Sequence, residues 1–190
     1  WRSWFCYHFG YNGTRCYRSG KNYSIAYKRI FMALQWTEIA TTQSAQDTKN
    51  VAAALAMVVG PGDVITLDGD LGAGKTQFTQ GIAEELDIEG PVTSPTFNLV
   101  ISYDDGCMPL YHFDLYRLED PAELEDIDFY GIVEGDGVSC IEWASKFLDD
   151  MPEDRLEVFL EVTGEHSRTI KARALGSAGQ LLDFWQQALA

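Results

Sequence analysis

The sequence of 190 residues has the length of one ordinary domain, and its 46% hydrophobic and 23% charged residues are typical of a soluble globular protein. It contains no run of eighteen apolar residues, so we expect no membrane-spanning helix. Residues 32–190 hold eight basic residues against 29 acidic ones, a net charge of −21, which disfavours direct nucleic-acid binding, because phosphate backbones are bound mainly through Lys and Arg.

Residues 1–31 differ in character from the rest of the chain. They carry six basic residues and no acid, are rich in aromatic residues, and follow neither a helical nor a strand period. Met32 is followed by well-patterned sequence, so we expect translation to begin there and residues 1–31 to be a non-native or disordered extension. An organelle-targeting peptide is the alternative, but it would be amphipathic and poorer in aromatic residues. We expect one domain in residues 32–190.

The four cysteines are widely spaced and include no C-x-x-C pair. This spacing predicts neither a disulfide framework nor a cysteine-ligated metal site. Cys140 lies in an apolar run, where a buried thiol behaves as a small hydrophobic side chain. A reducing cytoplasm is therefore the expected location.

The first predicted elements alternate between strand and helix. Trp36–Thr41 has the pattern of a short edge strand, and the small polar residues of Thr42–Gln46 are suited to capping a helix. Ala52–Val59 is predicted to be helical up to a Gly-Pro-Gly turn. The β-branched strand Asp63–Asp68 then leads directly into a glycine-rich segment, and Gln77–Leu86 places apolar residues at helical spacing.

The second half of the body is predicted to contain more strands than helices. The expected strands are Phe97–Tyr103, Leu110–Asp114, Val138–Ile141, Arg155–Val162 and Arg168–Leu175, and the expected helices are Ala122–Ile127 and Ala178–Leu189. Strands alternate with helices at first and pair as hairpins later. This order predicts a single α/β domain with a mixed central sheet flanked by helices.

The segment Gly69–Thr76 reads G-D-L-G-A-G-K-T and matches the phosphate-loop pattern G-x-x-x-x-G-K-[ST]. Glycines permit the turns that point successive N–H groups at phosphate oxygens, and the following helix adds the positive end of its dipole. Lys75 is expected to reach the β- and γ-phosphates, and the Thr76 hydroxyl to ligate Mg²⁺. The residues expected to contact the nucleotide here are Gly69, Leu71, Gly72, Ala73, Gly74, Lys75 and Thr76. The motif therefore predicts a P-loop NTPase-like domain that binds ATP and Mg²⁺.

The loop alone does not decide which reaction occurs. A GTPase would need a guanine-reading N-K-x-D element, and the sequence has none. A small-molecule kinase would carry an arginine-bearing lid, but only four arginines follow the loop. ATP hydrolysis is the favoured interpretation, with a small-molecule kinase and a non-hydrolysing nucleotide sensor left as alternatives.

Three further motifs follow the loop in order. Thr93–Phe97 reads T-S-P-T-F, His112–Arg117 reads H-F-D-L-Y-R, and Glu142 precedes Trp143. With the loop, these motifs make the chain from about residue 36 to its end resemble the TsaE family. That family is the ATPase component of the bacterial machinery that makes threonylcarbamoyladenosine in tRNA. The resemblance implies a weak, partner-stimulated Mg²⁺-dependent ATPase that acts with TsaD and TsaB and leaves tRNA to them.

The resemblance also implies roles for single residues. Family members hold Mg²⁺ between the loop threonine and a later acid, which here are Thr76 and Glu142. Independently, the apolar strand before Glu142 would deliver its carboxylate beside the loop, although a solvated carboxylate at a strand end is the alternative. Asp114 and Lys75 are the expected catalytic residues; Asp114 would act as a base or organise the metal, and a turn-capping role is its alternative.

Other expectations concern the surroundings of the nucleotide. Thr96 belongs to a segment that resembles a switch sensing the γ-phosphate, and a merely rigid turn is the alternative. Trp143 is expected beside the metal and nucleotide, and His112 is either structural or part of the site. Family members contact the base through loops that match Thr41–Thr42 and Glu165–His166. Arg117 is expected to pair with nearby acids.

Overall fold

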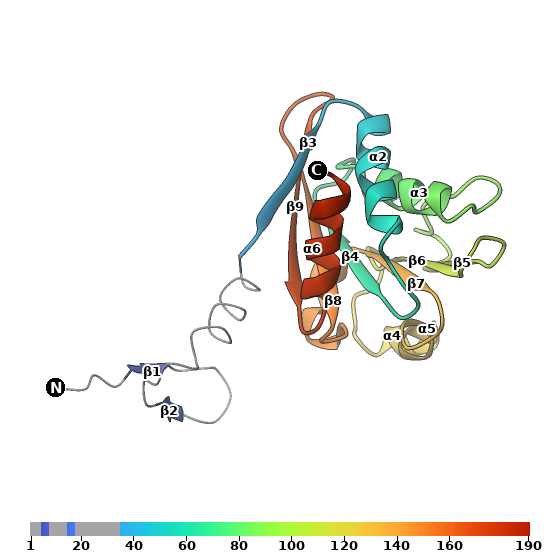
Figure 1. The fold of residues 1–190 in the computed structure, drawn as a ribbon. Coiled ribbons are helices and arrows are strands. Elements are labelled where there is room, and N and C mark those ends of the chain that lie inside the picture. The colour runs from blue at the N-terminus through green and yellow to red at the C-terminus, as the bar shows by residue number, and fades with distance from the viewer. Residues whose placement is uncertain (1–4, 8–14, 18–34) are drawn as a thin grey trace.

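The computed structural model describes residues 5–7, 15–17 and 35–190 (Figure 1). Strands β1 (Phe5–Tyr7) and β2 (Arg15–Tyr17) pair antiparallel. The remainder of the expected extension lies outside the described residues, so the assignment of residues 1–31 stays a prediction. Within the described part of the chain, no helix is both long and apolar enough to cross a membrane.

The body is built on a seven-stranded mixed sheet with the strand order β3-β9-β8-β4-β7-β6-β5. Its strands are β3 (Thr37–Thr42), β4 (Val64–Asp68), β5 (Val100–Tyr103), β6 (Leu110–Asp114), β7 (Val138–Glu142), β8 (Arg155–Val162) and β9 (Arg168–Leu175). The central strands β8, β4, β7 and β6 are parallel to one another. At one side β5 pairs antiparallel with β6, and at the other β9 pairs antiparallel with β8 and β3 pairs antiparallel with β9. The expected α/β fold class is confirmed.

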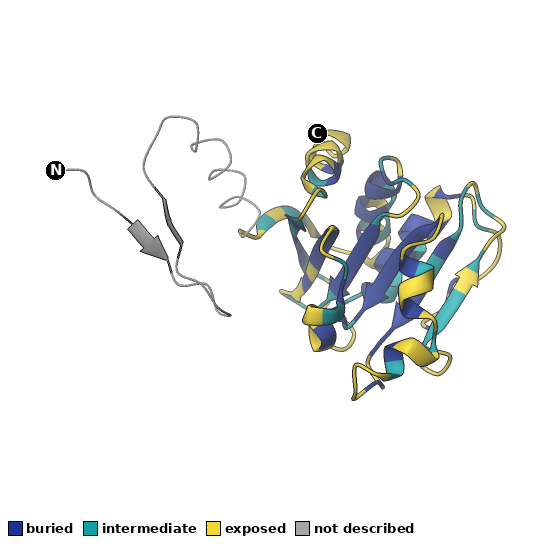
Figure 2. Ribbon diagram, turned by 90° about the horizontal axis from the view of Figure 1, so that it is seen from below, coloured by how far each residue is buried: buried dark blue, intermediate teal, exposed yellow. Residues whose placement is uncertain are grey.

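Helices cover both faces of the sheet (Figure 1). One face carries α2 (Ala45–Ala56), α3 (Lys75–Glu85) and α6 (Gly179–Ala188); the other carries α4 (Glu123–Asp126), α5 (Phe129–Val133) and the 3₁₀ helix η1 (Ala144–Asp150). Side chains alternate along β4, so Ile65 packs in the first core and Val64 in the second. Figure 2 shows the central strands almost wholly buried. A sheet packed on both faces holds the strand ends rigidly.

The predicted boundaries hold best where the chain's local pattern is strong. The hairpin strands β8 and β9 and the strand β6 have the expected bounds. Helix α2 begins at Ala45, well before the expected start, because the Ser44 side chain accepts a hydrogen bond from Asp47 N and caps the helix. Its polar first turns are therefore helical as well.

The prediction was wrong at the start of β5, which begins at Val100 rather than Phe97. The N–H groups of Asn98 and Leu99 both donate to Pro95 O, and Leu99 has a φ of 65°. This turn leaves the Phe97 side chain 86% exposed. Helices α5 and η1 were not predicted, because each is too short for a helical period to be visible in the sequence.

Candidate functional site

The glycine-rich loop joins the end of β4 to the start of α3. Gly69, Gly72 and Gly74 have φ values of 142°, 79° and 107°, in the region that favours glycine. At Gly69 an added Cβ would also lie 2.4 Å from Leu160 O of the neighbouring strand β8. The loop conformation therefore requires glycine at these positions.

The loop presents backbone N–H groups that have no partner among the described residues. Ala73 N donates to Asp70 O at 3.0 Å, whereas no acceptor in the described residues bonds the amides of Gly74, Lys75 and Thr76. These amides open the N-terminus of α3, where the helix dipole is positive. Such a set of N–H groups fits an anionic phosphate chain.

Lys75 is folded back onto the loop. Its side chain is 4% exposed, and Nζ donates to Gly69 O at 2.8 Å and to Asp70 O at 3.1 Å. Nζ also lies 3.9 Å from the centroid of the Trp143 ring, a cation–π contact. Burial lowers the pKa of Lys75, and nearby carboxylates, Glu142 first, oppose the shift. A bound phosphate would stabilise the charged ammonium further.

Thr76 and Glu142 meet as expected, and His112 joins them. Thr76 Oγ1 donates to Glu142 Oε1 at 2.8 Å, and His112 Nε2 lies 2.9 Å from the same oxygen. A carboxylate only accepts, so Nε2 carries the proton, while the buried Nδ1 has no partner among the described residues. His112 therefore orients the Glu142 carboxylate.

Whether Thr76 and Glu142 can hold a metal ion depends on which other ligands are available to it. No group of three or more His, Cys, Asp or Glu in the described residues could hold a metal alone. Mg²⁺ commonly takes one or two protein oxygens and completes its shell with phosphate oxygens and water. The adjacent hydroxyl of Thr76 and carboxylate of Glu142 suit that mode, beside the amides that fit a phosphate chain.

Asp114 organises the T-S-P-T-F segment. It is 2% exposed, and its Oδ2 accepts from Thr96 Oγ1 at 2.6 Å and from Ser94 Oγ at 3.0 Å. Its Oδ1 accepts from Tyr116 N at 3.0 Å. Asp114 ends β6 and is in register with Glu142, which ends the neighbouring parallel strand β7. The two carboxylates therefore lie at one edge of the sheet.

The residues after β6 and β7 bring aromatic side chains to this edge. Trp143 has a φ of 63°, a strained conformation for a bulky residue, and its ring lies 5.1 Å from that of Tyr116. Arg117 stacks over the Phe97 ring at 5.1 Å and forms no salt bridge with any described residue. The expectation that Arg117 pairs with nearby acids was wrong, because its guanidinium stacks over the exposed Phe97 ring instead.

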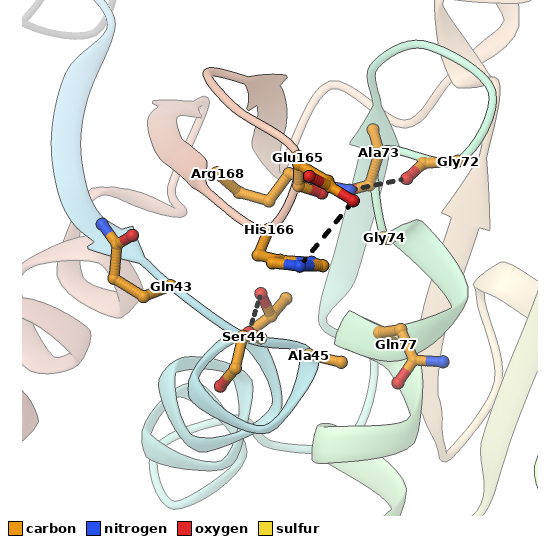
Figure 3. A pocket seen from close by; sticks show the side chains of 11 residues that line it. Gln43, Ser44, Ala45, Gly72, Ala73, Gly74, Gln77, Glu165, His166 and Arg168 are labelled. Carbon is orange, nitrogen blue, oxygen red and sulfur yellow. Dashed lines mark hydrogen bonds and ion pairs between the residues drawn. The ribbon is translucent and has the colours of Figure 1, made fainter.

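A pocket of about 410 Å³ adjoins the loop, between the start of α2 and the turn that joins β8 to β9 (Figure 3). Its lining residues are Gln43, Ser44, Ala45, Thr48, Gly72, Ala73, Gly74, Gln77, Glu165, His166 and Arg168. Glu165 and His166 line this pocket, and their contact with a base stays a prediction. Thr41 and Thr42 are not among its lining residues, and Thr42 Oγ1 is hydrogen-bonded to Thr48 Oγ1 at 3.0 Å.

Comparison with known proteins decides the family. The family model described as "Threonylcarbamoyl adenosine biosynthesis protein TsaE" matches residues 42–170. The chain belongs to the TsaE family. The protein named "tRNA threonylcarbamoyladenosine biosynthesis protein TsaE" of Bacillus subtilis is 43% identical over 141 residues, which cover 74% of this chain and 88% of the relative.

A second relative and a solved structure agree with this assignment. The TsaE protein of Rickettsia felis is 37% identical over 142 residues, 74% of this chain and 82% of the relative. The crystal structure of Bacillus subtilis YdiB superposes with a TM-score of 0.69 at 34% identity, covering 82% of this chain and 97% of that one. The likeness to these proteins spans most of the body.

In this TsaE-family protein the sequence motifs meet at one edge of the sheet, but two supporting contacts were not predicted. Arg168 contacts the loop from β9, and Asp68 Oδ1 accepts from Ser145 N and Oγ at 3.2 and 2.6 Å. The second contact fixes the chain just after Trp143. Both join segments far apart in the sequence, and no local pattern marks them.

Proposed function

We propose that this protein binds ATP with Mg²⁺ and hydrolyses it as an accessory factor in threonylcarbamoyladenosine modification of tRNA, together with homologues of TsaD and TsaB. The observation that carries the proposal is the convergence at one site of unbonded loop amides, the Lys75 ammonium and the paired oxygens of Thr76 and Glu142. Family membership supports the pathway, since relatives are named for tRNA threonylcarbamoyladenosine biosynthesis.

Each group at the site has a distinct part in this proposal. The amides of Gly74, Lys75 and Thr76 and the Lys75 ammonium would hold the phosphates, and Thr76 and Glu142 would hold Mg²⁺. The metal would neutralise charge that develops on the transferred phosphoryl group. Asp114 keeps the Thr96 and Ser94 hydroxyls beside the site, so the T-S-P-T-F segment can respond to the γ-phosphate or help to orient the attacking water.

The pocket next to the loop is the proposed site of the nucleoside. It shares Gly72, Ala73 and Gly74 with the phosphate loop, so the base and ribose can occupy it while the phosphates stay bound to the loop amides. His166 lies on its wall, opposite the start of α2 (Figure 3). An aromatic ring on one side and helix backbone on the other suit a flat base.

Exposed apolar side chains beside the site support contact with a protein partner. Leu71 in the loop and Phe97 in the T-S-P-T-F segment are 85% and 86% exposed. Both extend from segments that touch the proposed nucleotide, so a partner seated on them would sense its presence. The strong negative charge of the body makes tRNA itself a poor ligand.

The decisive experiment follows phosphate from γ-labelled ATP with and without TsaD and TsaB homologues. We expect slow release of free phosphate by the protein alone and faster release when both partners are present. Label transferred to a small acceptor would instead indicate a kinase. Tight ATP binding without phosphate release, even with the partners, would indicate a nucleotide sensor.

The lowered pKa of Lys75 predicts a pH dependence of ATP binding. Phosphate favours the protonated amine, so affinity should fall as pH rises through the lowered pKa, below the ordinary value of 10.5. Above that pKa each further pH unit lowers the affinity for ATP by up to about tenfold, and binding takes up a proton. Calorimetry in two buffers of different ionisation enthalpy measures the uptake. A Lys75→Arg control should bind without this dependence, and constant wild-type affinity up to pH 10.5 would contradict the prediction.

A further inference from the structure

Arg168, the first residue of β9, joins two separate segments through one side chain. Its Nε donates to Ala73 O at 2.9 Å and its Nη2 to Gly72 O at 3.2 Å, both in the phosphate loop. Its Nη1 donates to Ser167 O at 2.9 Å and to Gly164 O at 3.2 Å, in the turn between β8 and β9. Figure 3 shows the guanidinium reaching from the turn toward Gly72.

The two loop contacts fix the orientation of two successive peptide units. In a trans peptide the C=O and N–H groups point in opposite directions. With Gly72 O held by Arg168, the Ala73 N–H points the other way, where it donates to Asp70 O and closes the turn. With Ala73 O held likewise, the Gly74 N–H is turned away from Arg168 and has no acceptor in the part of the chain that the structure describes. Arg168 thus helps to set the direction of an amide that the proposed phosphate site needs.

The turn contacts act on the other side of the same pocket. Gly164 and Ser167 flank Glu165 and His166, which line the pocket. Arg168 is bonded to the backbone on both sides of these two residues, so the position of the pocket wall depends on the same guanidinium as the loop. A planar guanidinium with five donors can hold both segments at once, which an ammonium cannot do with the same geometry.

The charge of Arg168 also differs from that of the other cations on its strand. Lys171 pairs with Glu161, and Arg173 pairs with Glu157. Among the described residues Arg168 forms no salt bridge, and all its acceptors are backbone carbonyls. Its positive charge therefore remains available beside the loop.

We propose that Arg168 is a positioning residue that couples the nucleoside pocket to the phosphate loop, so that base and phosphates are bound by one connected unit. The proposal rests on the nucleotide binding proposed above. It assigns Arg168 no contact with the reacting atoms. Its effect is on the geometry of the loop amides and of the Glu165–His166 wall.

The first test compares Arg168→Lys with wild type, using ATP and inorganic tripolyphosphate with Mg²⁺ as probes. Lysine keeps the charge but lacks the planar guanidinium that bonds both segments, so ATP affinity should fall about tenfold or more. The ratio of the tripolyphosphate Kd to the ATP Kd measures the nucleoside contribution, and it should fall toward one. The matched control Arg173→Lys, on the same strand, should leave both affinities within about twofold of wild type. Wild-type affinity in Arg168→Lys, or an unchanged ratio, would overturn the proposal.

A second test needs no variant and decides the matter if Arg168→Lys does not fold. Tripolyphosphate can occupy the loop but carries no nucleoside to touch the pocket wall. In hydrogen–deuterium exchange of the wild-type chain it should slow exchange in the loop and also in the turn at residues 163–167. Protection confined to the loop would refute the coupling while leaving nucleotide binding intact. Absence of any ATP binding by wild type would instead refute the proposed function.

Discussion

Asp114→Asn is expected to lower partner-stimulated phosphate release by about 100- to 10,000-fold, the range for loss of an acid–base or water-orienting group. Asparagine keeps the shape of the side chain, and its oxygen can still accept from Tyr116 N, while its amide can donate to the hydroxyls of Thr96 and Ser94. What is lost is the negative charge at the T-S-P-T-F segment. ATP affinity should be unchanged or slightly tighter, because one carboxylate fewer faces the phosphates.

The measurement is the rate of phosphate release with TsaD and TsaB homologues at saturating ATP, alongside a separate ATP titration. Asp126→Asn, an equivalent change at an exposed position of α4, serves as the control and should leave the rate unchanged. Full turnover in Asp114→Asn would remove the charge of Asp114 from the mechanism. Lost ATP binding would show that Asp114 shapes the binding site rather than the reaction.

Lys75→Ala is expected to weaken ATP binding by about 1.5–3 kcal/mol, roughly ten- to a hundredfold, the usual contribution of a hydrogen bond from a charged group. The substitution also leaves Glu142, Asp68, Asp114 and Asp70 without the cation that attracts them, so the site becomes more negative toward phosphate. Isothermal calorimetry with Mg²⁺·ATP measures the loss directly.

The control for this substitution is Lys171→Ala, which removes a partly exposed lysine paired with Glu161. It should bind ATP like wild type, because a surface ion pair contributes little and lies outside the site. Equal affinity of Lys75→Ala and wild type, with both proteins folded, would mean that the ammonium of Lys75 does not reach the phosphates.

The features that could be predicted from the sequence are those set by local chemistry. The phosphate loop follows from glycine spacing, and its positive φ values at Gly69, Gly72 and Gly74 are a property of glycine itself. The β8–β9 hairpin follows from alternating residues around a turn, and its bounds agree with the prediction. Strand alternation likewise places His112 and Asp114 on one face of β6.

Features that depend on contacts between distant segments could not be predicted. The start of β5 was misplaced, because Phe97 continues an apolar pattern while the hydrogen bonds to Pro95 O turn the chain there. In the sequence Arg168 has the pattern of an ordinary strand residue, and only the fold shows that β9 lies against the loop. The shared use of Glu142 Oε1 by Thr76 and His112 also depends on the strand order β4-β7-β6, which periodicity does not specify.

The proposed function depends on one event, the capture of a triphosphate by the loop between β4 and α3. Its most direct test is a calorimetric titration of the full wild-type chain with Mg²⁺·ATP at neutral pH. We predict a saturable heat that fits one site per chain and is matched by inorganic tripolyphosphate only at weaker affinity. Absence of binding heat at millimolar ATP, from protein shown by circular dichroism to be folded, would contradict it.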